Sequence, residues 1–62
     1  MDKGVIKKER ELVDGRMYYK VMLKRDTLFA FWYEEFGSYN QDATDKVYDE
    51  ISRAKNITKY KV

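Results

Sequence analysis

The Asp14-Gly15 pair determines more of the fold of this 62-residue chain than any other short segment does. Asp-Gly between two extended segments is a strong signal for a two-residue β-hairpin, because both central residues of a type I′ turn need a positive φ. Such a turn fixes the register of the segments on either side of it. Glu9 should then lie opposite Lys20, and this attractive pair of charges supports the register.

Two further extended segments can be recognised beside this turn. We expect strands at about residues 5–13, 16–24 and 27–36, because the second and third segments are rich in the aromatic and β-branched residues that suit a pleated sheet. The second turn, at Arg25-Asp26, contains no glycine. Its type therefore stays open, and a slip of one residue there would exchange the two faces of the third strand.

From Asn40 onward the spacing of apolar residues becomes helical, which predicts a helix over about residues 40–55 with Asn40 as its N-cap. The apolar stripe of this helix consists of Ala43, Val47, Ile51 and Ala54. Residues 57–62 form either a short C-terminal strand or a frayed tail, and whether this segment covers the second face of the sheet stays open. The sequence thus predicts one small α+β domain over residues 1–62: a three-stranded antiparallel β-meander with one C-terminal α-helix packed on one face (β-β-β-α).

The expected register divides the side chains of the sheet between two faces. The face assigned to the core, under the helix, carries Ile6, Leu12, Met17, Tyr19, Val21, Leu23, Leu28, Ala30 and Trp32. The other face carries Lys7, Glu9, Tyr18, Lys20, Met22, Phe29, Phe31 and Tyr33. A half-solvated antiparallel sheet should alternate apolar with polar residues, whereas residues 28–33 are apolar on both sides. We therefore expect an exposed aromatic patch, which usually marks an interaction site.

The composition excludes several kinds of chemistry. The chain has no Cys and no His, so a disulfide framework, a Cys/His zinc site and Ser-His or Cys-His catalysis are impossible. Its three glycines form no phosphate-binding loop. The adjacent Glu34 and Glu35 should point to opposite faces of a strand instead of sharing a pocket. We expect no enzyme, no cofactor, no metal and no small-molecule substrate.

The longest apolar run, from Leu28 to Tyr33, is far shorter than the about 20 residues that a membrane-spanning helix needs. No membrane partner is expected. The lack of cysteine fits a reducing cytoplasm, which would be the host cytoplasm if the chain is encoded by a virus. A phage or mobile-element origin is suggested by size alone.

The main functional hypothesis is a small non-catalytic binding protein that docks its aromatic sheet face on a macromolecular partner. A protein is favoured over DNA, for example a host factor that a phage-encoded inhibitor modulates. The candidate partner-binding residues are Tyr18, Lys20, Met22, Phe29, Phe31 and Tyr33. A structural homodimer is an alternative, because so short a chain buries little surface alone.

The first alternative, ahead of the homodimer, is DNA binding. The sequence Phe-Gly-Ser-Tyr-Asn-Gln-Asp-Ala-Thr-Asp-Lys-Val-Tyr-Asp-Glu-Ile at residues 36–51 resembles the end of AP2-type DNA-binding domains, where a Gly-Thr-Phe turn leads into a helix carrying Ala-Tyr-Asp-Glu. The related arm-binding domains of phage and transposon integrases also have three strands followed by a helix. The resemblance implies that a sheet face enters the DNA major groove. The nucleic-acid-binding candidates are Lys7, Arg10, Arg16, Lys20 and Lys24. Those families place Arg and Trp on the reading face, whereas here mainly Phe and Tyr are expected there, with Trp32 pointing inward.

Overall fold

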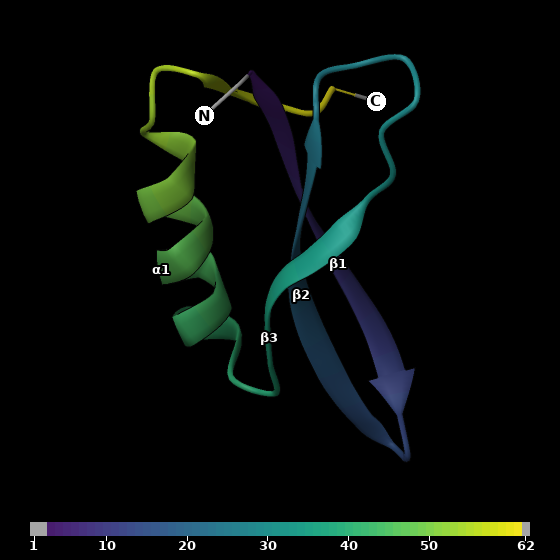
Figure 1. The fold of residues 1–62 in the computed structure, drawn as a ribbon. Helices are drawn as coiled ribbons and strands as arrows, with labels where there is room; N and C mark the ends of the chain where they lie inside the picture. Colours follow the sequence, from purple (N-terminus) through teal and green to yellow (C-terminus); the bar gives the residue numbers. More distant parts are fainter. Residues whose placement is uncertain (1–2, 62) are drawn as a thin grey trace.

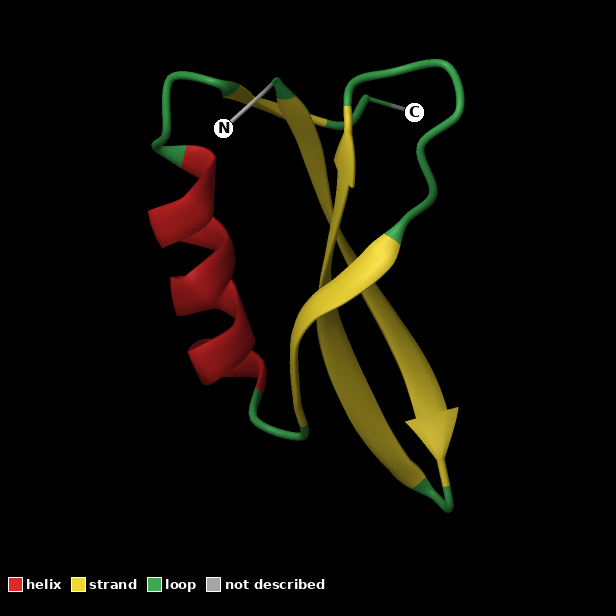
Figure 2. Cartoon of the chain, in the orientation of Figure 1, coloured by secondary structure: helices red, strands yellow, loops and turns green. Residues whose placement is uncertain are grey.

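The computed structural model describes residues 3–61 as a twisted sheet with a helix on one face (Figures 1 and 2). The elements in chain order are β1 (Gly4–Val13), β2 (Arg16–Arg25), β3 (Tyr33–Ser38), α1 (Gln41–Ser52) and β4 (Ile57–Lys59). The strands lie in the order β3-β2-β1-β4, with β4 parallel to β1 and the other pairs antiparallel. The predicted α+β architecture is therefore confirmed, with a short fourth strand added to the three main ones.

The hairpin between β1 and β2 forms at Asp14-Gly15 as predicted. Asp14 has φ 49° and Gly15 has φ 79°, the two positive values that a type I′ turn requires. The register of the hairpin is also as predicted, since Glu9 lies opposite Lys20. This turn positions every side chain of the two long strands.

The predicted third strand is wrong in its first half. The residues from Asp26 to Trp32 form a loop, and pairing with β2 begins only at Tyr33. Val21 consequently lies opposite Phe36 instead of Ala30, and a β-bulge between Val21 and Met22 leaves one residue of β3 unpaired. Without a glycine at Arg25-Asp26, the chain makes a longer connection, and the register that results places Phe36 against the core.

The core is small and lies between the sheet and α1. Its buried hydrophobic side chains are Ile6, Val21, Leu23 and Ile57, and the partly buried side chains packed on them are Phe36, Val47, Tyr48 and Ile51. Two residues assigned to the core from the sequence are exposed instead, Leu12 at 69% and Leu28 at 90%. Leu12 lies near the hairpin turn, at the far end of β1 from the buried Ile6. Leu28 lies outside the sheet, because residues 26–32 form a loop and β3 begins only at Tyr33.

Asn40 begins α1 as predicted. Its side-chain oxygen accepts a hydrogen bond from the Ala43 N–H at 3.2 Å, which satisfies one of the free donors of the first turn. The helix ends at Ser52, with Arg53 as its C-cap. Ala54 therefore lies beyond the helix and is exposed, so it does not belong to the apolar stripe.

The C-terminal segment forms a strand, which was one of the two predicted outcomes. Ile57 of β4 lies opposite Gly4 and enters the core, and the Tyr60 N–H extends the pairing by donating to the Ile6 carbonyl at 2.8 Å. The turn after α1 thus brings the chain back to the edge of β1 that is not paired with β2.

Candidate functional site

The loop between β2 and β3 carries the most exposed apolar side chains among residues 3–61. Leu28 is 90% exposed, Phe29 85% and Phe31 87%. We call residues 26–32 the apolar loop, and Figure 1 shows it projecting at the end of the sheet where β4 lies. Its first residue is tied to the residue that precedes β1, because the Asp26 N–H donates to the Lys3 backbone carbonyl at 2.8 Å. The loop therefore has a fixed base and an apolar tip.

Trp32 holds the other end of the apolar loop against the helix-free face of the sheet. The ammonium of Lys7 lies 4.3 Å from the centre of the indole ring, and that of Lys24 lies 5.2 Å from it, within the range of cation–π attraction. Tyr60 packs edge-on against the same ring, at 5.4 Å between centroids. The prediction that Trp32 points inward is wrong, because Lys7 and Lys24 project from the face opposite to the core.

Tyr18 lies further along the helix-free face, next to Tyr19, where the pairing of β2 with β3 ends. Its hydroxyl donates to the Glu34 carboxylate at 3.0 Å, and its ring packs edge-on against Tyr39 at 5.0 Å. The hydrogen bond to Glu34 raises the pKa of Tyr18 above its ordinary value. A Cβ at position 37 would collide with the Tyr18 hydroxyl. Glycine at this position therefore leaves the space that the Tyr18 side chain occupies.

The charges on the helix-free face are largely paired with one another. Lys7 forms an ion pair with Glu9 at 2.9 Å, and Lys20 forms one with Glu11 at 3.3 Å. The hydrogen bond from Lys7 lowers the pKa of the Glu9 carboxyl below its ordinary value. Two of the cations that the sequence offered for phosphate binding are thus engaged with carboxylates.

The structure does not bring the predicted partner-binding residues together. Tyr18, Lys20 and Met22 lie half-buried on the helix-free face, whereas Phe29 and Phe31 lie on the apolar loop. Tyr33 pairs with Leu23 and therefore belongs to the helix side, where it is 49% exposed. The expected flat aromatic face is replaced by a protruding loop.

The predicted nucleic-acid-binding residues are also divided between two faces. Lys7, Arg16, Lys20 and Lys24 project from the helix-free face. Arg10 lies opposite Tyr19, which shares the helix side of the sheet with the buried Val21. A single sheet face therefore presents four of these five cations.

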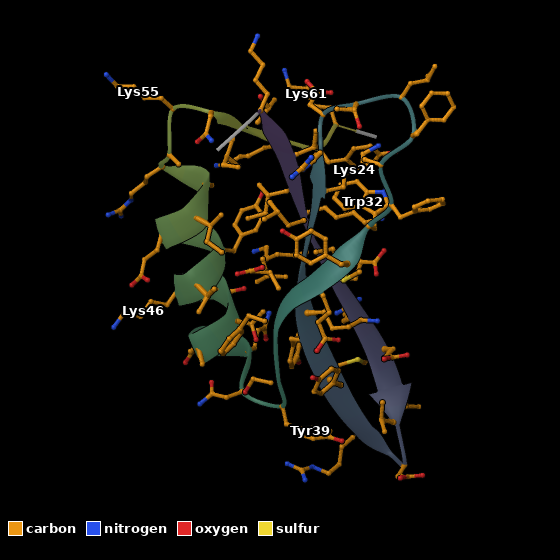
Figure 3. The ribbon with its side chains drawn as sticks, viewed as in Figure 1. Lys24, Trp32, Tyr39, Lys46, Lys55 and Lys61 are labelled. Carbon is orange, nitrogen blue, oxygen red and sulfur yellow. The ribbon has the colours of Figure 1, made fainter. Side chains whose placement is uncertain are left out.

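Among residues 3–61, several basic residues that join no ion pair gather around the apolar loop, and the sequence alone did not indicate this grouping. Lys24 and Arg25 precede the loop directly. The backbone carbonyl of Lys3 accepts the hydrogen bond from the Asp26 N–H, and Lys61 follows Tyr60, whose ring contacts Trp32. None of these four cations joins an ion pair among residues 3–61. Figure 3 shows Lys24, Lys61 and Trp32 at the end of the molecule that carries the loop. The cations come from three separate segments, so only the fold brings them together.

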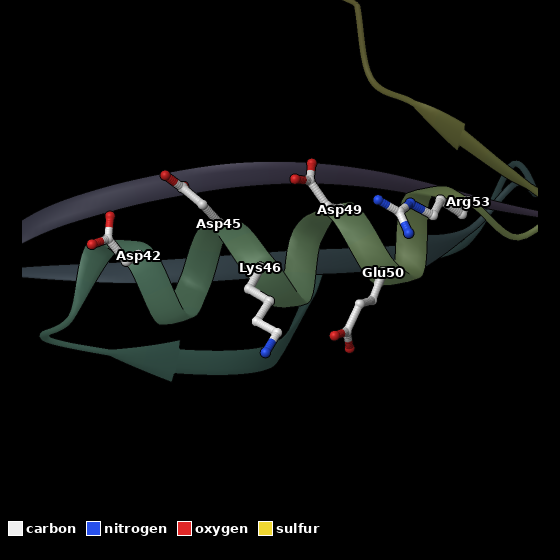
Figure 4. Close-up of a pocket in the computed structure, with 6 residues that line it drawn as sticks. All are labelled: Asp42, Asp45, Lys46, Asp49, Glu50 and Arg53. Carbon is white, nitrogen blue, oxygen red and sulfur yellow. The ribbon is translucent and has the colours of Figure 1, made fainter.

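The solvent side of α1 carries a shallow depression lined only by charged side chains (Figure 4). Its lining residues are Asp42, Asp45, Lys46, Asp49, Glu50 and Arg53. Asp45 accepts a hydrogen bond from Lys8 of β1 at 3.2 Å, which ties the helix to the sheet. Within residues 3–61, no cluster of His, Cys, Asp and Glu is arranged to hold a metal ion.

Comparison with known protein families, curated proteins and solved structures found no match to this chain. The resemblance to AP2-type and integrase arm-binding domains accordingly stays a prediction. In the described part of the chain, no helix combines the length and apolar character needed to cross a bilayer.

Proposed function

We propose that this chain is a small non-catalytic binding protein that docks on a larger partner through Leu28, Phe29 and Phe31 of the apolar loop. The observation that carries the proposal is their exposure, 85% or more for each of the three side chains. Full burial of each would contribute about 1.5–3 kcal/mol, enough for a few side chains to dominate an interface.

The position of the exposed side chains favours a loop that inserts into its partner over a flat sheet face that lies against it. The sequence-based expectation of a protein partner assumed an aromatic sheet face, and the anchors Phe29 and Phe31 lie on a projecting loop instead. A projecting apolar tip needs a partner with an apolar interior that the side chains can enter. Tyr18 and Lys20 already have partners within the chain, Glu34 and Glu11, and so contribute less to docking.

The two alternatives have weaker support. For DNA binding through the helix-free face, the ion pairs of Lys7 and Lys20 would have to be broken before either could bind phosphate. For a homodimer held together by the apolar loops, two sets of unpaired cations would be brought close together, which opposes association. Both alternatives stay predictions, as does a cytoplasmic site of action for a phage-encoded protein.

A capture experiment tests the proposal. Wild-type protein is immobilised and exposed to a total cell lysate that retains its membranes, with and without nuclease. The tip variant, Leu28→Ser with Phe29→Ser and Phe31→Ser, should lose the captured material. The control Leu12→Ser, an exposed apolar residue at the hairpin end, should keep it. Equal capture by the wild type and the tip variant would refute the proposal.

A further inference from the structure

We infer that the apolar loop inserts into the interface of an anionic lipid bilayer. This inference rests on the proposed function, because it takes the apolar loop as the docking element, and it names the partner. It departs from the sequence-based expectations of a protein partner and of no membrane partner; the latter considered only a membrane-spanning segment, not insertion of a loop into the interface. Lipid acyl chains are an apolar interior that projecting side chains can enter without a pre-shaped pocket. Leu28, Phe29 and Phe31 are the side chains that would enter.

The chemistry of this end of the molecule follows the order of layers in a bilayer. The apolar tip is followed in the chain by Trp32, which lies in edge-to-face contact with Tyr60. Trp and Tyr are enriched at the level of the lipid headgroups. The cations Lys24 and Lys61 lie at the same end (Figure 3). A loop that buries its tip among the acyl chains would thus place the two aromatic rings and the ammonium groups near the headgroups.

The charge of this end favours an anionic surface. Among residues 3–61, the cations Lys3, Lys24, Arg25 and Lys61 join no ion pair, and Asp26 is the one carboxylate within the apolar loop. Glu34 and Glu35 follow the loop in β3, where the Glu34 carboxylate accepts a hydrogen bond from Tyr18. Basic residues next to an insertion element are attracted to anionic lipids, each with about 1 kcal/mol near the surface. The cytoplasmic leaflet carries such lipids, which agrees with the proposed site of action.

The other occupants of the loop fit less well. Nucleic acid would use aromatic rings for base stacking, and within the apolar loop only Phe29 and Phe31 offer free rings, because Lys7 and Lys24 lie over Trp32 and Leu28 has no ring. A second copy of the chain would place its own cations against those of the first. A protein partner would need a preformed apolar pocket with an acidic rim.

Vesicle binding tests the inference, and the single tryptophan of the chain, Trp32, is its reporter. Wild-type protein is titrated with vesicles of phosphatidylcholine containing phosphatidylglycerol, and with vesicles of phosphatidylcholine alone. Lipids brominated on the part of the acyl chain next to the headgroup quench tryptophan that lies at the level of the headgroups. Wild-type protein should bind the anionic vesicles with quenching of Trp32 and should bind the neutral vesicles far more weakly.

Two variants and two matched controls separate insertion from simple charge attraction. The tip variant should lose both binding and quenching. Arg25→Gln with Lys61→Gln should weaken binding about 25-fold, at about fivefold for each cation. The control Lys46→Gln with Arg53→Gln removes the same charge from the solvent side of α1 and should change binding less than about threefold. Leu12→Ser should leave binding unchanged.

Three results would overturn the inference. The first is absence of wild-type binding to the anionic vesicles, and the second is equal binding of the wild type and the tip variant. The third is that the protein binds a single-stranded oligonucleotide through Phe29 and Phe31 and does not bind vesicles. The lysate capture distinguishes the two proposals. Capture that depends on the loop, without vesicle binding, keeps the binding function and assigns its partner to another class.

Discussion

Replacing Ile57 tests whether β4 belongs to the folded core. Ile57 is 8% exposed and packs with Ile6, Val21 and Leu23, although it lies in a strand of three residues close to the end of the described chain. Truncation to alanine removes buried methyl groups and leaves a cavity, which typically costs about 2–5 kcal/mol. The milder Ile57→Val should cost about 0.5–1.5 kcal/mol.

These costs are large compared with the stability of so short a chain. At about 0.05–0.15 kcal/mol for each residue, a chain of 62 residues has a free energy of unfolding of about 3–9 kcal/mol. Ile57→Ala should therefore leave a fold of marginal stability. Ile57→Val costs less, so this variant stays folded and its free energy of unfolding can be measured. Urea unfolding followed by circular dichroism gives the midpoint and the slope for each variant.

The neighbouring residue gives the matched control. Thr58 lies on the same strand but is exposed, so Thr58→Ala should change the free energy of unfolding by less than about 0.5 kcal/mol. If Ile57→Ala were as mild as Thr58→Ala, β4 would not be docked on β1 and the buried position of Ile57 would be wrong.

Three further variants test the cap and the Tyr18 contact. Asn40→Ala should cost about 1 kcal/mol in urea unfolding, because the Ala43 N–H loses its acceptor; an unchanged midpoint would exclude the cap. The Tyr18 pKa is raised in the folded state by the hydrogen bond to Glu34, so the stability from this contact is full below the ordinary tyrosine pKa and is lost as pH rises through the raised value. Glu34→Gln should remove that alkaline loss, and an ultraviolet titration of the wild type and the variant would show whether the phenol returns to its ordinary pKa. Gly37→Ala should have the same effect on the titration by displacing the Tyr18 hydroxyl; an unaltered titration would show that Tyr18 does not occupy this position.

The sequence predicted the parts of the fold that local chemistry determines. The Asp14-Gly15 turn needs positive φ at both residues, and it fixes the pairing of β1 with β2 wherever the rest of the chain goes. Asn40 marks the helix start for a similarly local reason, since its side chain accepts from a backbone N–H three residues ahead.

The apolar loop could not be predicted in the same way. Residues 28–33 have the composition of a strand. Whether they pair with β2 depends on which of the possible registers between β2 and the following segment is the more stable. Pairing Val21 with Phe36 places a large side chain in the core, whereas pairing it with Ala30 would not. The site depends on this outcome, because the exposure of Phe29 follows directly from the loop. The nearby cations, such as Lys61, are collected by the pairing of β4 with β1, which involves residues far apart in the sequence.

Leu28, Phe29 and Phe31 are free for a partner because the fold does not need them. The most direct test is the free energy of unfolding of the tip variant, measured at several protein concentrations. The three exposed substitutions should together change it by no more than about 1.5 kcal/mol, and the midpoint should not depend on concentration. A loss of about 3 kcal/mol or more, as a single buried phenylalanine would give, or a midpoint that rises with concentration, would show that these side chains are buried within the protein or between its copies.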